Sequence, residues 1–587
     1  MGYTPFENIK TLIGMLKAYN IKHIVLSPGN RNIPFVYLVE EDPFFTCYSI
    51  VDERSAAFFA IGLIERLNVP VAICCTSGTA VCNYTSGVAE AFYQGLPLVV
   101  LTADRNPYYL NQNEDQMVPQ ADLLKSIVKF SAQLPKINTS KDLWYCKNRI
   151  HSALLELNHG KPGPVHIDFP VEEGIGDCSD GYREEIPVIR RIHRFELGNR
   201  QKLWENKKKE LESAKIMIVY GQSNVIDARL VNAVNRFTER YNCVVAADLL
   251  SNVRCRNQVN MFTLCEIISD KEKDEMMPDI IITINGNFVQ GVKGFIAKRK
   301  KPVKHYAIDR SGELKDQFRC IDSIWECSPT EFFEYFADGG KSDDSYYRLI
   351  RARNDAIVMP EVEYSSLYVV NKLLSAIPTD SIFHIANSSS VRLANLFPIN
   401  KGVKIYCNRG TNGIDGSCSS FIGNALAAAD KLAFLLIGDL SFFYDMNSLW
   451  NRYSTKNVRI LLQNNEGAEL FHYGYGAKLA HINRHIAAEH FATTKGWAEN
   501  QGYLYLSAHN KAEFEEAMKI FVAESDKPIM FEVFTKKDVD AKTLQEYYAV
   551  NRSFDAQRAL TDKVKKIAHG SSLLESTLRK AKNKLNK

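Results

Sequence analysis

Two polar turns in the last third of the sequence contain residue types that bind a divalent cation. Gly438-Asp-Leu-Ser441 follows an apolar, strand-like run, and Asn464-Asn465 follows the next such run, with Gly467 close behind. Because parallel strands end at the same edge of a sheet, Asp439, the amide oxygen of Asn465 and the carbonyl of Gly467 would lie close together. Magnesium takes one or two carboxylates and leaves its other positions to phosphate oxygens and water. The pattern therefore predicts a site for Mg²⁺ (or Mn²⁺) that also needs a phosphate-bearing ligand.

A glycine-rich stretch upstream, Asn408-Arg-Gly-Thr-Asn-Gly-Ile-Asp-Gly416, supplies the other half of such a site. Its glycines free backbone N–H groups to approach an anion, and the N-terminus of the helix predicted to follow favours negative charge. A Gly-Asp pair after a strand is ordinarily only a turn. Its combination with this loop and with an Asn 26 residues after Asp439 instead favours a bound diphosphate.

A second candidate site lies in the first third of the chain, where Val51-Asp-Glu-Arg-Ser-Ala-Ala-Phe-Phe59 joins a β-prone segment to an apolar helix. One interpretation is structural, with Asp52 or Glu53 capping the helix. The other is catalytic: Glu53 shares a proton in a dry pocket formed by the apolar residues 58–61, because desolvation raises the pKa of a carboxyl group. The residues alone leave both interpretations open.

Short apolar strands alternate with helical patterns along the whole chain, which predicts an α/β protein built on parallel sheets. Ligands of such sheets bind at the carboxyl ends of the strands. A charged stretch after Pro187 and the pair Gly339-Gly340 separate three series of strands. We expect domains over residues 1–185, 186–345 and 346–550, and a basic extension over 551–587. The expected strands are Ile24–Leu26, Val71–Cys75, Leu98–Leu101, Val165–Phe169, Ile216–Tyr220, Val244–Ala247, Ile280–Ile284, Tyr306–Asp309, Ile382–Ile385, Val403–Tyr406, Leu432–Ile437, Val458–Leu462 and Met530–Val533.

Composition excludes several other classes of protein. A chain of 587 residues with 45% hydrophobic and 24% charged residues is typical of a large globular enzyme. A net charge of +4 gives no reason to expect a nucleic-acid partner. The thirteen cysteines form no Cys-x-x-Cys motif, which favours a reducing, cytoplasmic location. No apolar run reaches the length of a membrane span, and the N-terminus has the pattern of an amphipathic helix rather than a signal peptide.

With these motifs the sequence resembles the thiamine diphosphate-dependent decarboxylase and carboligase superfamily, whose metal motif begins with Gly-Asp and ends in paired Asn. The resemblance implies a pyrimidine-binding first domain, a central linking domain and a diphosphate-binding third domain, assembled as a homodimer or homotetramer. It assigns Glu53 as the catalytic residue that activates the cofactor and Ile414 as the residue that holds it bent. The implied metal ligands are Asp439, Asn465 and Gly467, and the implied cofactor-binding residues are Glu53, Arg409, Gly410, Gly413, Ile414, Asp415, Gly438, Asp439, Leu440, Ser441 and Asn465.

More narrowly, the sequence resembles the synthases of menaquinone biosynthesis within that superfamily. The stretches that carry this resemblance are Ser27–Pro34, Asp52–Gly62, Thr76–Ala80, Leu101–Arg105 and Asn408–Gly416. It implies 2-oxoglutarate as the donor and isochorismate as the acceptor, both carboxylates of the kind that arginine binds in two places. The implied donor residues are Ser388, Arg392 and Arg409, the implied acceptor residues are Asn30, Arg31, Arg105, Gln116 and Lys293, and Leu470 and Phe471 complete the substrate site.

Several positions depart from the family pattern, most of them near the expected acceptor. Asn30 and Asn32 replace small hydroxyl residues, Asp115 stands where Asn is expected, and Glu466 replaces an Asn after the metal motif. An unpaired polar group in a binding site changes substrate preference strongly. A diverged carboligase acting on another 2-oxo acid and acceptor, for example in cell-surface sugar synthesis, is therefore an alternative. An inactive scaffold protein and a nicotinamide or flavin oxidoreductase are weaker ones, the last because no Gly-x-Gly-x-x-Gly follows an early strand.

Overall fold

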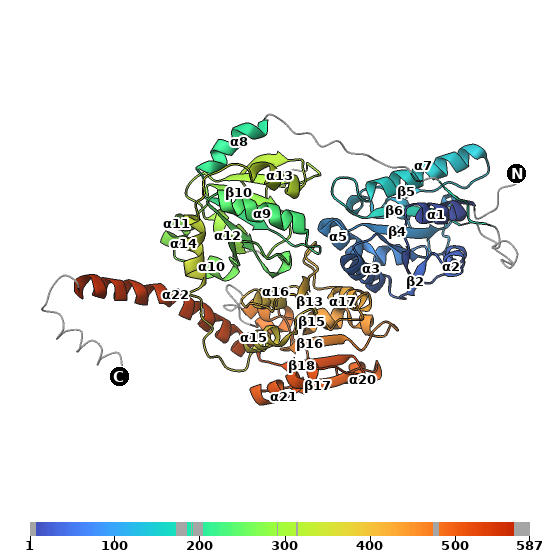
Figure 1. Ribbon diagram of the computed structural model, residues 1–587. Coiled ribbons are helices and arrows are strands. Elements are labelled where there is room, and N and C mark those ends of the chain that lie inside the picture. The colour runs from blue at the N-terminus through green and yellow to red at the C-terminus, as the bar shows by residue number, and fades with distance from the viewer. Residues whose placement is uncertain are drawn as a thin grey trace.

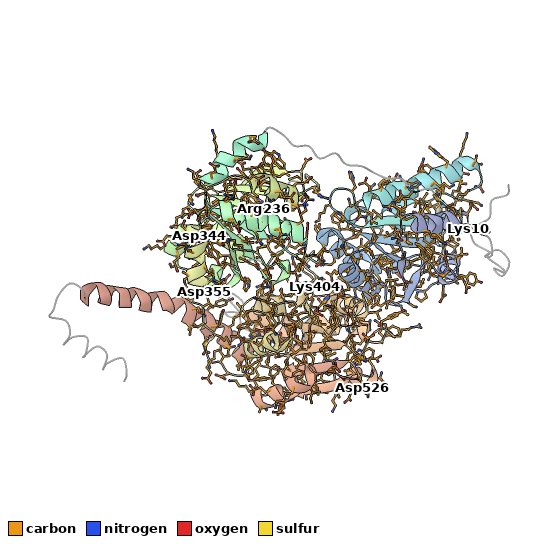
Figure 2. The ribbon with its side chains drawn as sticks, viewed as in Figure 1. Lys10, Arg236, Asp344, Asp355, Lys404 and Asp526 are labelled. Atoms are coloured by element: carbon orange, nitrogen blue, oxygen red, sulfur yellow. The ribbon has the colours of Figure 1, made fainter. Side chains whose placement is uncertain are left out.

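Three six-stranded parallel sheets, each covered by helices, make up the molecule (Figure 1). The computed structural model describes residues 7–171, 185–189, 191, 203–289, 291–312, 315–472 and 481–568. Every strand pairing is parallel, as the alternation of strands and helices predicts for an α/β chain. Figure 2 shows the side chains filling the space between the elements of all three domains, with Lys10 in the first, Arg236 in the central and Asp526 in the third.

The first sheet has the strand order β2-β1-β3-β4-β6-β5. Its inner strands are continuous apolar runs because helices cover both faces. Its strands are β1 (His23–Leu26), β2 (Thr46–Ser49), β3 (Val71–Cys75), β4 (Leu98–Asp104), β5 (Ser131–Gln133) and β6 (Val165–Pro170). Its helices are α1 (Glu7–Ala18), α2 (Ile33–Glu40), α3 (Glu53–Leu67), α4 (Thr79–Asn83), α5 (Thr85–Gln94), α6 (Gln120–Leu123) and α7 (Ser140–Glu156).

The central sheet has a different order, β12-β11-β10-β7-β8-β9. Numbered from β7, this is the 3-2-1-4-5-6 order of dinucleotide-binding domains, but the loop after β7 reads Gly221-Gln-Ser-Asn224 and has no glycine-rich fingerprint. Its strands are β7 (Ile216–Tyr220), β8 (Cys243–Ala247), β9 (Gln258–Val259), β10 (Ile280–Ile284), β11 (Lys304–Ile308) and β12 (Ile321–Trp325). Its helices are α8 (Leu203–Glu212), α9 (Ala228–Arg240), α10 (Phe262–Ile267), α11 (Asp270–Met276), α12 (Gly291–Ala297) and α13 (Pro329–Phe336).

The third sheet, β14-β13-β15-β16-β18-β17, repeats the strand order of the first. Its strands are β13 (Ile382–Ile385), β14 (Lys404–Tyr406), β15 (Ala433–Gly438), β16 (Val458–Asn464), β17 (Leu504–Ala508) and β18 (Ile529–Phe534). The helices of this region are α14 (Ser345–Asn354), α15 (Ser366–Ala376), α16 (Ser389–Ala394), α17 (Ser417–Leu426), α18 (Asp439–Tyr444), α19 (Ile482–His485), α20 (Lys495–Asn500), α21 (Lys511–Phe521) and α22 (Lys537–Ala568).

All thirteen strands expected from apolar runs are present, with boundaries shifted by at most a few residues. β2 lies in the segment before Val51 that the sequence marks as β-prone, and the prediction missed β5, β9, β12 and β17. Each of these lies at an edge of its sheet, where one flank has no partner strand, so a short and partly exposed sequence is sufficient. Periodicity cannot separate such edge strands from loops.

The first and third domains of one chain share a hydrophobic core, formed where α3 packs against α17. The two helices approach so closely that a Cβ at Gly62 would lie 1.9 Å from the carbonyl oxygen of Ser420. A Cβ at Gly423 would lie 2.3 Å from the carbonyl oxygen of Phe59. Only glycine permits this contact.

Two helices join the third domain to the central one. In α14, Tyr346 and Ile350 are buried in the core of the central domain, so packing favours a boundary beyond Asn354 rather than at residue 345. The first turns of α22 lie on the third domain, and the helix then runs past α10, as Figure 1 shows in red. The rest of the basic extension, residues 569–587, lies outside the described residues.

Candidate active site

A cavity of about 430 Å³ lies at the carboxyl edge of the third sheet, where the sequence predicts the diphosphate and the metal. It is bounded by the turns after β13, β15 and β16 and by the glycine-rich loop. The predicted residues that line it are Ser388, Arg392, Arg409, Ile414, Gly438, Asp439, Leu440, Ser441, Asn465, Gly467, Leu470 and Phe471. The structure thus gathers into one cavity residues that are separated by up to 83 positions in the chain.

Asp439 connects the two turns of the predicted metal site. Its side chain is buried, and it accepts hydrogen bonds from three backbone N–H groups: Leu440 at 2.6 Å, Asn465 at 3.1 Å and Gly467 at 2.9 Å. The last two bonds join the ends of β15 and β16, so the carboxylate fixes the distance between the two predicted turns.

The side-chain amide of Asn465 is oriented by two buried acids. Its Nδ2 donates to Glu469 Oε2 at 3.1 Å and to Asp540 Oδ2 at 3.3 Å. Burial and the neighbouring charge of Asp540 raise the pKa of Glu469 well above its ordinary value. Burial also raises the pKa of Asp540. Because Nδ2 is engaged with these carboxyl groups, Oδ1 remains available as the metal-binding atom.

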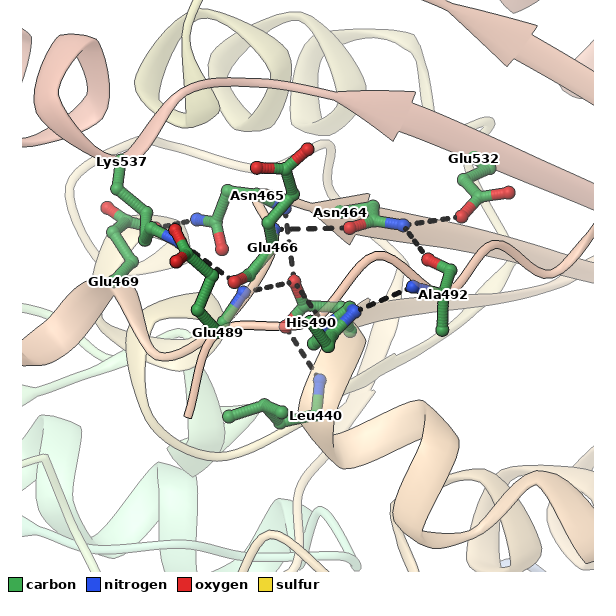
Figure 3. A network of polar contacts seen from close by, with 12 residues as sticks. Leu440, Asn464, Asn465, Glu466, Glu469, Glu489, His490, Ala492, Glu532 and Lys537 are labelled. Atoms are coloured by element: carbon green, nitrogen blue, oxygen red, sulfur yellow. Dashed lines mark hydrogen bonds and ion pairs between the residues drawn. The ribbon is translucent and has the colours of Figure 1, made fainter. Parts of the chain in front are cut away.

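Three further residues, which the sequence did not predict, contact the predicted metal site: Lys537, Glu489 and His490. Lys537 Nζ donates to the carbonyl of Glu466 at 2.7 Å and lies 3.4 Å from Glu489 Oε1 (Figure 3). His490 Nε2 lies 3.3 Å from Asp439 Oδ2, and its Nδ1 accepts from the N–H of Ala492 at 3.1 Å. No sequence motif marks these residues, because Glu489 and His490 lie beyond α19 and Lys537 follows β18.

These residues fit the predicted metal. Within the described ranges, no three or more Asp, Glu, His or Cys side chains are arranged to hold an ion by themselves. Asp439, the amide oxygen of Asn465 and the carbonyl of Gly467 offer one charged and two neutral oxygens, and Mg²⁺ takes its other ligands from phosphate and water. Gly467 has a φ of +140°, a conformation open to glycine, and a Cβ there would lie 2.5 Å from the carbonyl oxygen of Ala487.

The glycine-rich loop is held from beneath by Asn387. Asn387 Nδ2 donates to the carbonyls of Asn408 at 2.5 Å and Gly413 at 2.7 Å, and its Oδ1 accepts from Arg409 Nη1 at 3.0 Å. Ser388, next to it, has a φ of +68°, a strained conformation of the kind that clusters at functional sites. Of the predicted cofactor residues in this loop, Arg409 and Ile414 line the cavity, whereas Gly410, Gly413 and Asp415 do not.

A second cavity of about 1280 Å³ adjoins the first between the central and third domains. Arg392, Arg409 and Leu470 line both cavities. Desolvation, with the charge of Arg409 nearby, lowers the pKa of Lys293 and also that of Arg392. Such mutual repulsion between cations indicates a site for an anion. Sequence reasoning missed Arg299, Arg319, Gln545, Tyr548 and Arg552, which also line this cavity.

Glu53 does not cap α3. Asp52 does, accepting from the N–H groups of Arg54 at 3.0 Å and Ser55 at 3.3 Å. Glu53 is partly exposed instead, and its Oε2 accepts from Asn83 Nδ2 at 2.9 Å. The dry pocket expected from residues 58–61 is not formed around it in one chain, because those residues pack into the core shared with the third domain. Glu53 also lies outside the linings of both cavities.

The remaining predicted acceptor residues lie together on the first domain but outside both cavities. Asn30 and Gln116 are exposed, the backbone N–H of Arg31 donates to Thr76 Oγ1 at 3.1 Å, and Arg105 pairs with Glu114. These residues follow β1 and β4, at the same carboxyl edge of the first sheet. One chain therefore places Lys293 near Arg409, where the two cavities meet, and leaves Asn30 and Gln116 exposed on the first domain. Arg105 is buried.

One of the departures from the family pattern receives a physical account. Asn32 is fully buried and donates to the carbonyl of Ser27 at 2.9 Å, so it stabilises the loop rather than facing a ligand. Glu466 is exposed at a φ of +64°. Asp115 is exposed beside Gln116.

Three parallel α/β domains, with a cavity at the edge of the third sheet that Asp439, Asn465 and Gly467 line, are the arrangement of a thiamine diphosphate-dependent enzyme. Comparison with known proteins agrees, since residues 9–124 match the thiamine pyrophosphate enzyme N-terminal TPP binding domain.

The chain belongs to the 2-succinyl-5-enolpyruvyl-6-hydroxy-3-cyclohexene-1-carboxylate synthase family. It is 38% identical to the synthase of Phocaeicola vulgatus over 556 residues, which cover 93% of this chain and 98% of that protein. It is also 38% identical to the synthase of Bacteroides fragilis, over 93% of this chain and 99% of that protein. The synthase of Flavobacterium psychrophilum is 33% identical, with the same coverage of 93% and 99%. In the part of the chain that the structure describes, no helix is long and apolar enough to cross a membrane.

Proposed function

We propose that this chain decarboxylates 2-oxoglutarate and adds the remaining four-carbon unit to isochorismate in menaquinone biosynthesis, using thiamine diphosphate and Mg²⁺. The observation that carries the proposal is the convergence of Arg392, Arg409 and Lys293 where the two cavities meet. Both substrates carry carboxylates, and arginine binds these in a bidentate manner. The same basic junction can therefore hold a donor on one side and an acceptor on the other.

The bound cofactor supplies the nucleophilic carbon that the reaction requires. Asp439, Asn465 and Gly467 would hold the metal that binds its diphosphate. Glu53 would share a proton with its pyrimidine ring, with Asn83 holding one carboxylate oxygen in place. Leu470 and Phe471 would exclude water from the junction, because they line it with apolar surface.

We propose a homodimer or homotetramer in which the first domain of a second chain covers the cavity. Glu53 and the exposed acceptor residues Asn30 and Gln116 face away from the cavities of their own chain, which supports a site completed by another copy. The expected cytoplasmic location still rests on the residues alone.

The reaction is tested by incubating purified protein with thiamine diphosphate, Mg²⁺, 2-oxoglutarate and isochorismate, and following carbon dioxide and the adduct by mass spectrometry. Both are expected in equal amounts. Carbon dioxide without an isochorismate adduct would indicate a diverged carboligase with another acceptor. No carbon dioxide from 2-oxoglutarate would refute the proposed donor.

The shared site is tested by mixing two inactive variants, Glu53→Gln and Asp439→Asn. In mixed dimers one of two sites combines the intact half of each chain, so random reassembly would restore about a quarter of the wild-type activity. Mixtures that stay inactive after verified subunit exchange would contradict a site built from two chains.

A further inference from the structure

A buried carboxylate of the first domain, Glu90 in α5, holds the loop that carries Arg409. Glu90 Oε1 accepts from the N–H of Gly410 at 2.9 Å, and Oε2 accepts from the N–H and the hydroxyl of Thr411, both at 2.7 Å. Gln94 Nε2 adds a fourth bond to Oε1 at 2.7 Å. Glu90 is 1% exposed, so these bonds replace water almost completely. A group that accepts four hydrogen bonds and donates none is bonded as a carboxylate.

The loop is therefore fixed from two sides. Asn387 holds Asn408 and Gly413 from the third domain, and Glu90 holds Gly410 and Thr411 from the first. Gly410 permits the approach, since a Cβ there would lie 2.5 Å from the carbonyl oxygen of Glu90. Gly410 is one of the residues that the resemblance assigns to the cofactor, and in this structure its backbone N–H donates to Glu90.

The loop needs such restraint because its Arg409 side chain lies near two other cations, Arg392 and Lys293. Burial lowers the pKa of both Arg392 and Lys293, and the nearby charge of Arg409 lowers each of them further, so Arg409 repels both cations. Before a dianionic substrate binds, repulsion favours moving Arg409 away from the junction. Glu90 opposes this movement through the backbone and makes no bond to the guanidinium, whose Nη2 can then bind a carboxylate while Nη1 donates to Asn387.

We propose that Glu90 is a positioning residue for Arg409 and thereby sets the affinity for the dicarboxylate donor, a role that rests on the proposed function of Arg409. The alternative is that Glu90 only docks the first domain on the third. Glu65, close by in α3, provides a matched control, because it is also buried and neither of its oxygens has a hydrogen-bond partner among the described residues. Burial, with the charge of Glu90, raises the pKa of Glu65 well above its ordinary value.

The test compares Glu90→Gln and Glu65→Gln in the full-length protein. The amide of Glu90→Gln presents N–H groups to backbone donors, so the loop shifts, and we expect the KM for 2-oxoglutarate to rise about tenfold or more with a smaller change in kcat. Glu65→Gln is expected to keep the wild-type KM. Thr411→Val, which removes one of the four bonds, is a milder variant that keeps the test valid if Glu90→Gln folds poorly, and its KM is expected to rise about threefold.

A second measurement does not depend on turnover. Glutarate, an unreactive dicarboxylate, is titrated into cofactor-free protein by calorimetry, and its dissociation constant is expected to rise in Glu90→Gln by the same factor as the KM. In a double-mutant cycle, Glu90→Gln is expected to have no further effect once Arg409 is alanine.

Equal glutarate binding by wild type and Glu90→Gln would overturn the proposal. So would an equal rise in KM in the Arg409→Ala background, or a lower melting temperature with an unchanged KM. Failure of the proposed function gives a different result, because the wild-type protein itself would then release no carbon dioxide from 2-oxoglutarate.

Discussion

Asp439→Asn is expected to lower two separate quantities: the stability of the ligand-free protein and the stability that it gains from its ligands. The carboxylate accepts three backbone N–H bonds, two of which join the ends of β15 and β16. The amide of asparagine has one acceptor oxygen, and its NH₂ faces at least one donor. Hydrogen bonds to charged groups contribute about 1.5–3 kcal/mol each, so losing one and weakening another would cost the third domain about 3 kcal/mol without any ligand.

The second loss appears only when ligands are present. At a hundred times its dissociation constant, a ligand that binds only the folded state stabilises it by about 2.7 kcal/mol. The wild-type protein is expected to gain about this much from thiamine diphosphate with Mg²⁺, and Asp439→Asn less than about 1 kcal/mol because its neutral amide is a poor ligand for Mg²⁺. Scanning calorimetry with EDTA, and then with both ligands, measures the two effects.

Asp445→Asn is the matched control. Asp445 is fully buried and accepts from the N–H and hydroxyl of Ser419, both at 2.7 Å, but it lines neither cavity. It is expected to lose stability and to keep the full gain from the ligands. If Asp439→Asn were as stable as wild type in EDTA, the backbone clamp would be refuted. If it gained as much from the ligands, its role in metal binding would be refuted.

Three further outcomes are expected. Glu53→Gln would lower kcat by about 100-fold or more, since general acid–base groups contribute 10² to 10⁴, while calorimetry would find thiamine diphosphate bound within a few-fold of wild type. Glu466→Asn would raise the free energy of unfolding by about 1 kcal/mol in chemical denaturation, because asparagine tolerates a φ of +64° better than glutamate. Burial lowers the pKa of His384 to about 3. Because the unfolded chain binds its proton near pH 6.5, the stabilising effect of neutral His384 is complete above that pH and is lost as the pH falls towards 3. When the pH falls from 7 to 5, the free energy of unfolding of the wild type is therefore expected to drop by about 2 kcal/mol more than that of His384→Phe. Melting curves at each pH measure this difference.

The sequence predicted those features that depend on short segments, namely the residues at the ends of buried strands and the inner strands themselves. Gly438, Asp439 and Asn465 follow buried strands, and parallel strands always end at a common edge, so their meeting in one cavity follows from the fold class. Burial on both faces makes the inner strands uniformly apolar, and this is why they were found. The edge strands β5, β9, β12 and β17 and the distinct order of the central sheet left no such trace, because they depend on pairing partners far away in the chain.

Local sequence thus determined the fold class, and its motifs pointed to the thiamine diphosphate cofactor of the family. Only the tertiary structure decided what each group contacts: that Asp52 caps α3 and leaves Glu53 to Asn83, that Asn32 faces inwards, and that Gly410 is held by Glu90. The physical reason is the range of the interactions. Strand patterning and turn chemistry act over a few residues, whereas the hydrogen bond between Glu90 and Gly410 joins groups 320 residues apart. No pattern in either segment predicts this contact.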